Sequence, residues 1–338
     1  MKTYNWGIIG PGRIARKFAN DLKLLPNARL HAVASNSLER AEAFAQEFGV
    51  GKVYNSYSAL ASDPDVDIIY IATLHTGHYR DTLLCLEHKK HVLCEKPVAI
   101  NRAQFEKMVE LATQKNVFFM EALWTRFTPS FIKCIELLNA GEIGDLRIVA
   151  ADFCINPPYS DQSRLFNPAL GGGSLLDIGI YPVFIALECA GVPHTIKAAA
   201  SIDSKNIDTI CSVIMQHENG VHSVLYSAST ANARIEAMLS GSKGILRLNK
   251  CFHTPTTLEL IHDGKEPRIF TFEGKGFGYQ YEAAEVMRCC DVGQKESELW
   301  SWEKSRRLIS TLDAIRMQTG IRYPDSVEST EVVEDVVN

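Results

Sequence analysis

Three short groups of residues have types and spacings that could support chemistry. In the first, Glu95 and Lys96 end an apolar run, and Pro97 restricts Lys96 to extended backbone geometry. In the second, Asp177 and Tyr181 are four positions apart in a stretch with helical spacing, so they share one helix face. The residues alone favour simpler interpretations: a surface charge pair before a turn, and a buried tyrosine near a helix-surface aspartate.

The third group is the glycine-rich sequence GPGRIA at residues 10–15, which matches the dinucleotide-binding pattern G-x-G-x-x-A. It lies between an expected strand and an expected helix, which is the context that the pattern requires. Gly10 allows a tight turn, and Gly12 lets a pyrophosphate approach the backbone. The helix that begins at Arg13 and Ile14 supplies amide donors to the phosphates. The alternative is a glycine-rich turn without a ligand, but the context favours nucleotide binding.

The residues after the second expected strand bear on which dinucleotide binds. An acidic side chain there would hold the ribose 2′-hydroxyl of NAD. The chain instead has Ser35 and Asn36, with Arg40 one turn later. A 2′-phosphate would not be repelled, and Arg13 and Arg40 could neutralise it. We therefore predict NADP as the cofactor. NAD is the alternative cofactor. A simpler interpretation is a solvated loop whose arginines contact nothing specific.

Expected strands and helices alternate along the first part of the chain. The strands are 4–9, 30–35, 66–72, 91–94 and 117–120, and the helices are 13–25, 38–48, 79–87 and 103–115. This alternation indicates right-handed βαβ units and a parallel sheet. We predict a doubly wound α/β Rossmann domain over residues 1–122, with ligands beyond the carboxyl ends of its strands.

The pattern changes after residue 122. Between residues 146 and 272, short segments alternate apolar and polar residues and are separated by turn signals such as Asp263-Gly264, which predicts a mostly antiparallel sheet. The expected helices are 131–138, 173–189, 281–290 and 302–318. We predict an α+β domain over residues 123–338, with a loosely held charged tail after Tyr323.

The composition excludes several classes of protein. The 338 residues are 46% hydrophobic and 22% charged, and the net charge of −5 argues against a nucleic-acid-binding protein. No apolar run approaches the ~18 residues of a membrane span, and the first residues lack a signal-peptide layout. Nine cysteines without a Cys-x-x-Cys spacing are typical of reduced thiols in the cytosol. We therefore expect a cytoplasmic protein without a nucleic-acid partner, a membrane partner or a metal site.

Four motifs together resemble the glucose-fructose oxidoreductase/inositol dehydrogenase (Gfo/Idh/MocA) family. They follow the family's order, and the resemblance covers nearly the whole chain. The motifs are GPGRIA (10–15), EKP (95–97), EALWTRF (121–127) and GGGSLLDIGIY (171–181). The third motif and Tyr181 most resemble the branch of dimeric dihydrodiol dehydrogenases and D-xylose dehydrogenases. Many other members of the family have histidine where this chain has Tyr181.

The resemblance implies a Rossmann domain followed by an α+β domain with a large open sheet. It also implies hydride transfer between a nicotinamide and a secondary alcohol or carbonyl of a sugar or cyclic diol. Tyr181 would be the acid/base residue, Lys96 would reach cofactor and substrate, and Asp177 would orient Lys96 or a substrate hydroxyl. An isolated tyrosine has a pKa of ~10, and a nearby ammonium such as that of Lys96 would lower this pKa.

The resemblance also assigns residues to the cofactor pocket. Glu95 would contact the nicotinamide ribose, and the stretch 73–78 would line the cofactor after a strand. Many members have Pro-Asn at the second and third positions of this stretch, and its histidines are expected in the pocket rather than on a metal. The further pocket candidates are Thr73, Leu74, His75, His78, Trp124 and Arg126. Tyr159, Arg164 and Phe166 are weaker candidates for the substrate mouth.

Two other functions stay open for such a chain: a reductase of small carbonyl compounds, and a regulatory protein that binds NAD(P) without catalysis. The presence of Lys96, Asp177 and Tyr181 argues against the second. One face of the expected open sheet must be covered, and in this family it often pairs with another subunit. We therefore predict a homodimer or a higher homo-oligomer.

Overall fold

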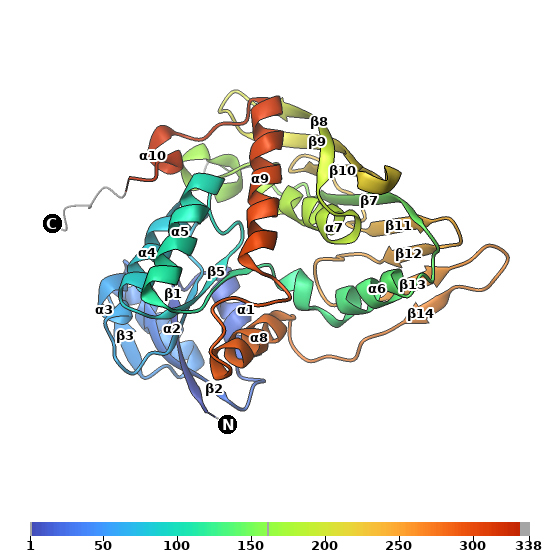
Figure 1. The fold of residues 1–338 in the computed structure, drawn as a ribbon. Coiled ribbons are helices and arrows are strands. Elements are labelled where there is room, and N and C mark those ends of the chain that lie inside the picture. Colours follow the sequence, from blue (N-terminus) through green and yellow to red (C-terminus); the bar gives the residue numbers. More distant parts are fainter. Residues whose placement is uncertain (1, 161, 332–338) are drawn as a thin grey trace. The chain divides into compact units, whose positions relative to one another are not determined.

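The computed structural model describes residues 2–160 and 162–331. Within them the chain forms two compact units, which Figure 1 shows in sequence colours. The first unit contains the chain up to Ala122, Ala284–Trp302 and the residues from Tyr323 onward; the second contains Leu123–Ala283 and Glu303–Arg322. One boundary between the units follows Ala122. The return of two later segments to the first unit differs from the single domain expected over 123–338.

Hydrogen bonds explain why the later segments belong to the first unit. The indole of Trp302 donates to the carbonyl of Phe119 over 2.9 Å. The amide of Gln104 donates to the carbonyl of Val327 over 2.8 Å. Helix α10 (Asp325–Glu328) is part of this tail. The expectation of a loosely held tail is therefore wrong for its described residues, because their backbone groups are paired with the first unit.

A six-stranded parallel sheet forms the centre of the first unit, in the order β3-β2-β1-β4-β5-β6. The strands are β1 (Tyr4–Ile9), β2 (Ala28–Ala34), β3 (Lys52–Tyr54), β4 (Ile68–Ile71), β5 (His91–Glu95) and β6 (Phe119–Ala122). All five pairings are parallel. The strand order reverses between β1 and β4, the place where doubly wound sheets bind ligands. The predicted doubly wound Rossmann domain is thus confirmed.

The helices of the first unit follow the apolar spacing of the sequence. They are α1 (Arg13–Leu22), α2 (Leu38–Phe48), α3 (Tyr57–Ala61), the 3₁₀ turn η1 (His75–Gly77), α4 (His78–Glu87) and α5 (Arg102–Lys115). Helix α1 packs with α2, and α4 packs with α3 and α5. Helix α8 (Tyr279–Asp291) begins in the second unit and ends in the first.

An eight-stranded sheet forms the centre of the second unit, in the order β14-β13-β12-β11-β7-β10-β9-β8. The strands are β7 (Leu146–Cys154), β8 (Pro193–Ile202), β9 (Asp208–His217), β10 (His222–Ala228), β11 (Ala237–Gly241), β12 (Ile245–Leu248), β13 (Leu258–Ile261) and β14 (Arg268–Phe270). Among the described pairings of this second sheet, only β7–β10 is parallel. The predicted mostly antiparallel sheet is therefore confirmed.

Helices α6 and α7 and the turn η5 pack on this sheet. The helices and helical turns of the second unit are η2 (Trp124–Phe127), α6 (Pro129–Asn139), η3 (Arg164–Phe166), η4 (Pro168–Leu170), the π-helical turn η5 (Leu175–Gly179), α7 (Ile180–Ala190), η6 (Glu218–Gly220) and α9 (Trp302–Thr319). Helix α7 packs against β7 and β10, and α6 packs against β12 and β13. Apolar side chains of β9, among them Val213 and Met215, are buried beneath them.

The helical stretch Pro168–Ala190 is long and apolar enough to cross a membrane by length and composition. This differs from the expectation that no apolar stretch approaches that length. The most apolar window of this stretch is 89% buried inside the structure. Such burial is typical of a core helix, whose apolar residues pack against its own unit.

Candidate active site

The glycine-rich turn after β1 has the geometry of a phosphate-binding loop. Gly10 has φ +83°, and a Cβ there would lie 2.9 Å from the carbonyl carbon and oxygen of Ala72. Gly12 begins helix α1, and a Cβ there would meet only the Gly10 oxygen, at 4.0 Å. The backbone at Gly12 is therefore open to a ligand beside the amides of the helix start. Ala15 is fully buried, as close packing of this helix requires. These features fit the pyrophosphate of a dinucleotide.

The segment after β2 carries no carboxylate at its first two positions. Ser35 is buried, and its hydroxyl accepts a hydrogen bond from the Ser37 backbone over 3.2 Å. Asn36 and Arg40 are exposed, Arg40 in the first turn of α2, and Arg13 is exposed at the start of α1. Both guanidinium groups are therefore on the surface of the first unit, where they can meet an anion in solution.

The stretch after β4 is tied to the EKP motif by His78. Its ring nitrogens lie 2.7 Å from the carbonyl oxygen of Pro97 and 3.2 Å from that of Thr73. The Thr73 hydroxyl donates to Asp81 over 2.8 Å. His75 is buried beside His78, whereas the neighbouring Leu74 is 40% exposed. His78 thus helps to fix the loop, and both of its ring nitrogens face carbonyl oxygens.

Glu95 is buried at the end of β5, with donors on both carboxylate oxygens. Tyr70 donates its hydroxyl to one oxygen, and the backbone N–H of Lys96 donates to the other over 3.2 Å. The Lys96–Pro97 peptide bond is cis, and Lys96 is half-buried. The Gly10 turn, the 73–78 stretch and the EKP motif follow β1, β4 and β5, which are neighbours in the sheet. The first unit therefore gathers these predicted cofactor residues along one sheet edge.

Tyr181 is buried on α7 among aromatic side chains of the second unit. Nε1 of Trp124 donates to its Oη over 2.9 Å. The phenol ring lies 5.4 Å from the ring of Phe153 and 5.2 Å from that of His253, between centroids. Trp124 stacks on Tyr279 with the centroids 4.3 Å apart. The structure thus joins two predicted site residues, Trp124 and Tyr181, and adds three rings that the sequence reasoning missed.

Asp177 lies in the π-helical turn η5, where the sequence predicted an α-helix. Its Oδ1 is 2.8 Å from Nη2 of Arg164, and the Asp177 side chain is only 8% exposed. Arg164 comes from η3, in the loop that we assigned to the substrate mouth. The pairing directs the carboxylate of Asp177 toward this loop.

The triple glycine before η5 makes room for groups that are distant in sequence. A Cβ on Gly172 would lie 2.4 Å from the Arg164 carbonyl oxygen. Gly173 has φ +117°, and a Cβ there would lie 2.0 Å from Oδ1 of Asp208. The other oxygen, Oδ2, accepts from the Leu175 backbone over 2.6 Å and from the Ser174 hydroxyl over 2.9 Å. The glycines therefore permit a close approach of protein groups.

Asp208 is almost completely buried, and no hydrogen-bond partner of its Oδ1 is found among the described residues. Burial raises the pKa of Asp208 to about 6, while the hydrogen bonds from Leu175 and Ser174 oppose this increase. Asp208 was not a candidate in the sequence, because no local spacing relates it to Gly173.

Arg126 forms an ion pair inside the second unit. Its Nε is 2.9 Å from Oε2 of Glu188, and the ammonium of Lys304 is also 2.9 Å from that oxygen. All three side chains are largely buried or half-buried. The pairing gives Arg126 a structural role within this unit, and its predicted contact with the cofactor stays a prediction.

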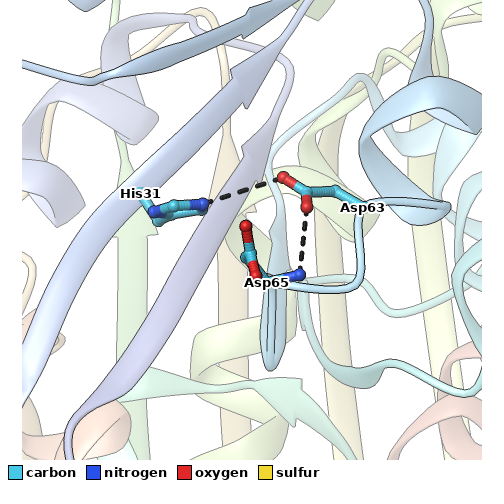
Figure 2. Close-up of side chains that lie close together, drawn as sticks. All are labelled: His31, Asp63 and Asp65. Atoms are coloured by element: carbon cyan, nitrogen blue, oxygen red, sulfur yellow. Dashed lines mark hydrogen bonds and ion pairs between the residues drawn. The ribbon is translucent and has the colours of Figure 1, made fainter.

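A polar cluster in the first unit brings His31, Asp63 and Asp65 together, as Figure 2 shows. Their ligand atoms lie within 4.8 Å of one another. However, the ammonium of Lys52 is 3.1 Å from both Asp63 oxygens and 2.8 Å from Asp65. Burial by itself raises the pKa of Asp63. Hydrogen bonds from the Asp65 backbone, Lys52 and Tyr54 outweigh this effect, so the pKa lies below its usual value. We interpret the cluster as an ion-paired clamp whose cation is Lys52.

Comparisons with known proteins agree with this architecture. The sequence profile described as "Oxidoreductase family, NAD-binding Rossmann fold" matches residues 4–123. The profile described as "GFO/IDH/MocA C-terminal domain" matches residues 131–247. The chain therefore belongs to the Gfo/Idh/MocA family and is an oxidoreductase with an NAD(P)-binding Rossmann domain. The predicted family, enzyme class and cofactor class are confirmed.

Several relatives resemble the chain over nearly its whole length. Trans-1,2-dihydrobenzene-1,2-diol dehydrogenase from Mus musculus is 38% identical over 331 residues, covering 94% of this chain and 98% of that protein. The protein of that name from Xenopus tropicalis is 35% identical, covering 94% of this chain and 99% of that protein.

Among solved structures, the 3-ketoreductase KijD10 from Actinomadura kijaniata, in complex with NADP and TDP-benzene, is 26% identical with a TM-score of 0.84. The match covers 94% of this chain and 98% of KijD10. The aldose-aldose oxidoreductase from Caulobacter crescentus has a TM-score of 0.86 at 24% identity and the same coverage, and supports the fold alone.

Proposed function

We propose that the protein is an NADP-preferring dehydrogenase of a sugar or a cyclic diol, with Tyr181 as its acid/base residue. The observation that carries the proposal is the buried phenol of Tyr181, whose oxygen is held by a hydrogen bond from Trp124. A family relative named for a dihydrobenzene diol and a structural relative named as a ketoreductase support this substrate class. A bound nicotinamide supplies the hydride chemistry, and the protein supplies orientation and proton transfer.

Three side chains have proposed roles in this reaction. Tyr181 takes the proton of the substrate alcohol in oxidation and returns it to the carbonyl oxygen in reduction. Lys96 supplies an ammonium that stabilises the tyrosinate. Asp177, held by Arg164 over 2.8 Å, orients a substrate hydroxyl at the loop that contains Arg164. Glu95 and the 73–78 stretch hold the nicotinamide end of the cofactor, with Trp124 and Arg126 at its edge.

The preference for NADP rests on the segment after β2. Ser35 and Asn36 place no carboxylate where it would repel a 2′-phosphate, and the exposed Arg13 and Arg40 offer positive charge. NAD stays the alternative, since the glycine-rich turn contacts only the part that both dinucleotides share.

A substrate panel read at 340 nm tests the proposal. Sugars, inositols and cyclic diols are offered with NADP⁺ or NAD⁺, and small carbonyl compounds with NADPH or NADH. We expect oxidation of a sugar or cyclic diol with NADP⁺. Turnover of small carbonyl compounds alone would favour the reductase alternative. Cofactor binding without turnover of any compound would favour a regulatory protein.

We also propose that a second copy of the chain covers the open face of the eight-stranded sheet. Met238, Ala150, Val224 and Ile214 are successive cross-strand partners on β11, β7, β10 and β9. Met238, Val224 and Ile214 are 37%, 46% and 51% exposed. A continuous apolar row of this kind is unusual on a monomer and favours association. A self-complementary contact of one such face would give a homodimer.

We further propose a cytoplasmic location, with no nucleic-acid or membrane partner. All nine cysteines are free thiols, which is typical of a reducing compartment. The excess of acidic residues supports the absence of a nucleic-acid partner. Fractionation of cells that express the protein tests the location, and recovery in a membrane fraction would contradict it.

A further inference from the structure

Trp124 and Tyr181 share a buried hydrogen bond whose direction is unambiguous. Nε1 of Trp124 lies 2.9 Å from Oη of Tyr181, and each side chain is only 5% exposed. An indole N–H donates and cannot accept, so the phenol oxygen is the acceptor. The hydroxyl proton of Tyr181 must therefore point away from the indole, toward another acceptor.

The indole is fixed by its neighbours on both sides of the contact. Its ring is stacked on Tyr279 at an interplanar angle of 6°, and it meets His253 edge-on with centroids 5.8 Å apart. Gly278, with φ +114°, lets the chain pass close: a Cβ there would lie 3.5 Å from the indole and 2.9 Å from Pro255. A donor held in this way need not reorganise when charge develops on its acceptor.

We propose that Trp124 is a positioning residue for Tyr181: its N–H directs the hydroxyl proton of Tyr181 toward the reacting oxygen and stabilises negative charge on Oη. This inference rests on the proposed acid/base function of Tyr181. In oxidation, Oη of deprotonated Tyr181 takes the proton of the substrate O–H, and a bound oxidised nicotinamide would accept the hydride from the carbon that bears this hydroxyl. Reduction is the reverse, and Trp124 neither gains nor loses a proton in either direction.

The alternative is that Trp124 is only an apolar wall for the substrate. A wall contributes to binding, so its loss would raise KM and leave the pH dependence unchanged. A hydrogen bond to a charged oxygen is stronger than one to a neutral oxygen. Loss of the N–H therefore destabilises the tyrosinate more than the tyrosine, and the apparent pKa of the oxidation reaction must rise.

A substitution that removes the N–H but keeps the ring tests the inference. Trp124 is replaced by 3-benzothienylalanine, which has sulfur in place of the indole N–H, and by Phe in a second variant. Trp302→Phe is the matched control, because it also removes an indole donor, which is half-buried and bonds to the Phe119 carbonyl. The pH profile of kcat/KM for oxidation is measured at saturating NADP⁺.

We expect both Trp124 variants to raise the apparent pKa of the profile by about one unit and to lower kcat/KM at neutral pH roughly tenfold. The control should leave the apparent pKa unchanged. A higher KM with an unchanged apparent pKa in the benzothienylalanine variant would overturn the inference.

A second readout does not depend on activity. Protein labelled with [ζ-¹³C]tyrosine gives a Tyr181 signal, assigned by its loss in Tyr181→Phe, and its titration reports the pKa of the phenol. We expect the benzothienylalanine variant to have the higher pKa, and an equal pKa would overturn the inference. If no compound on the substrate panel is turned over, the proposed function fails, but this titration still decides the role of Trp124.

Discussion

At the scale of single residues, three aspartates show how surroundings assign different roles to one side chain. Asp177 is paired with Arg164 and stays directed toward a loop. Asp63 is ion-paired with Lys52, whose ammonium supplies positive charge to the cluster. Asp208 is buried against Gly173 with no cationic partner among the described residues, and its pKa is raised to about 6. These roles depend on contacts between distant parts of the chain, so residue type and local spacing could not assign them.

The proposed NADP preference predicts a selective effect of Arg40→Ala. Loss of a charge-assisted hydrogen bond to a 2′-phosphate costs about 1.5–3 kcal/mol, or roughly 10- to 100-fold in affinity. We expect the dissociation constant of NADPH to rise by this factor, measured by fluorescence titration, while that of NADH changes little. Equal weakening of both cofactors would contradict a contact with the 2′-phosphate.

At the scale of elements, the long periodic segments could be predicted and the short ones could not. Helix α2 occupies Leu38–Phe48 as expected, because its apolar spacing, the Ser37 cap and Gly49 with φ +72° all agree. Strand β3 and helix α3 have only three and five residues, too few for a periodicity to be recognised. The π-helical turn η5 also escaped prediction, because its apolar residues fit an α-helical spacing equally well.

The buried carboxyl of Asp208 predicts a pH-dependent contribution to stability. Its folded pKa, about 6, is above the ordinary value of 3.8. Below pH ~4 the carboxyl is protonated in both the folded and the unfolded protein, and the stability that its protonated form gives is fully present. This stability is lost as the pH rises through ~6, because the unfolded protein gives up the proton more readily. Asp208→Asn removes the titration. We therefore expect the variant to gain stability relative to the wild type between pH 4 and 7, by roughly 3 kcal/mol at most.

Chemical denaturation of both proteins at several pH values measures this difference. Groups that titrate in both proteins cancel, so the comparison isolates Asp208. A difference in unfolding free energy that stays constant from pH 4 to 7 would show that burial does not raise the pKa of this carboxyl.

The tight packing of the triple glycine predicts a large effect of Gly173→Ala. The new Cβ would lie 2.0 Å from Oδ1 of Asp208 at a φ of +117°, so both strain and overlap oppose it. We expect a loss of about 3 kcal/mol or more, measured as a fall in Tm. Gly191→Ala is the control, because φ there is +81° but no atom lies within 4 Å. Equal falls in Tm would contradict the overlap.

At the scale of the whole molecule, the parallel and the mostly antiparallel nature of the two sheets could be predicted from the sequence. The sequence did not reveal that two later segments return to the first unit. Those segments are attached by several hydrogen bonds between residues distant in sequence, such as Trp302 to Phe119 and Gln104 to Val327, which have no local pattern. For the exposed apolar row on the second sheet, the sequence predicted only that apolar and polar residues alternate along each strand. The register between strands decides which exposed side chains become neighbours.

The proposed dimer face predicts that Ile214→Lys dissociates the protein. Ile214 is half-exposed and lies directly opposite Val224, so a buried ammonium there would lack a partner. We expect the mass measured by light scattering to fall from that of a dimer to that of a monomer. Met317→Lys is the control, because Met317 is 80% exposed on α9, outside the apolar row. A wild-type protein that is monomeric at micromolar concentration would contradict the proposal.

The most direct test of the central proposal is the turnover number of Tyr181→Phe. The variant keeps the buried ring beside Phe153 and His253 and loses only the hydroxyl that accepts from Trp124. General acid/base catalysis is worth about 10²–10⁴ in rate. We therefore predict that kcat falls at least roughly 100-fold with the dissociation constant of NADPH nearly unchanged, whereas near-full activity of the variant would contradict the assignment of Tyr181.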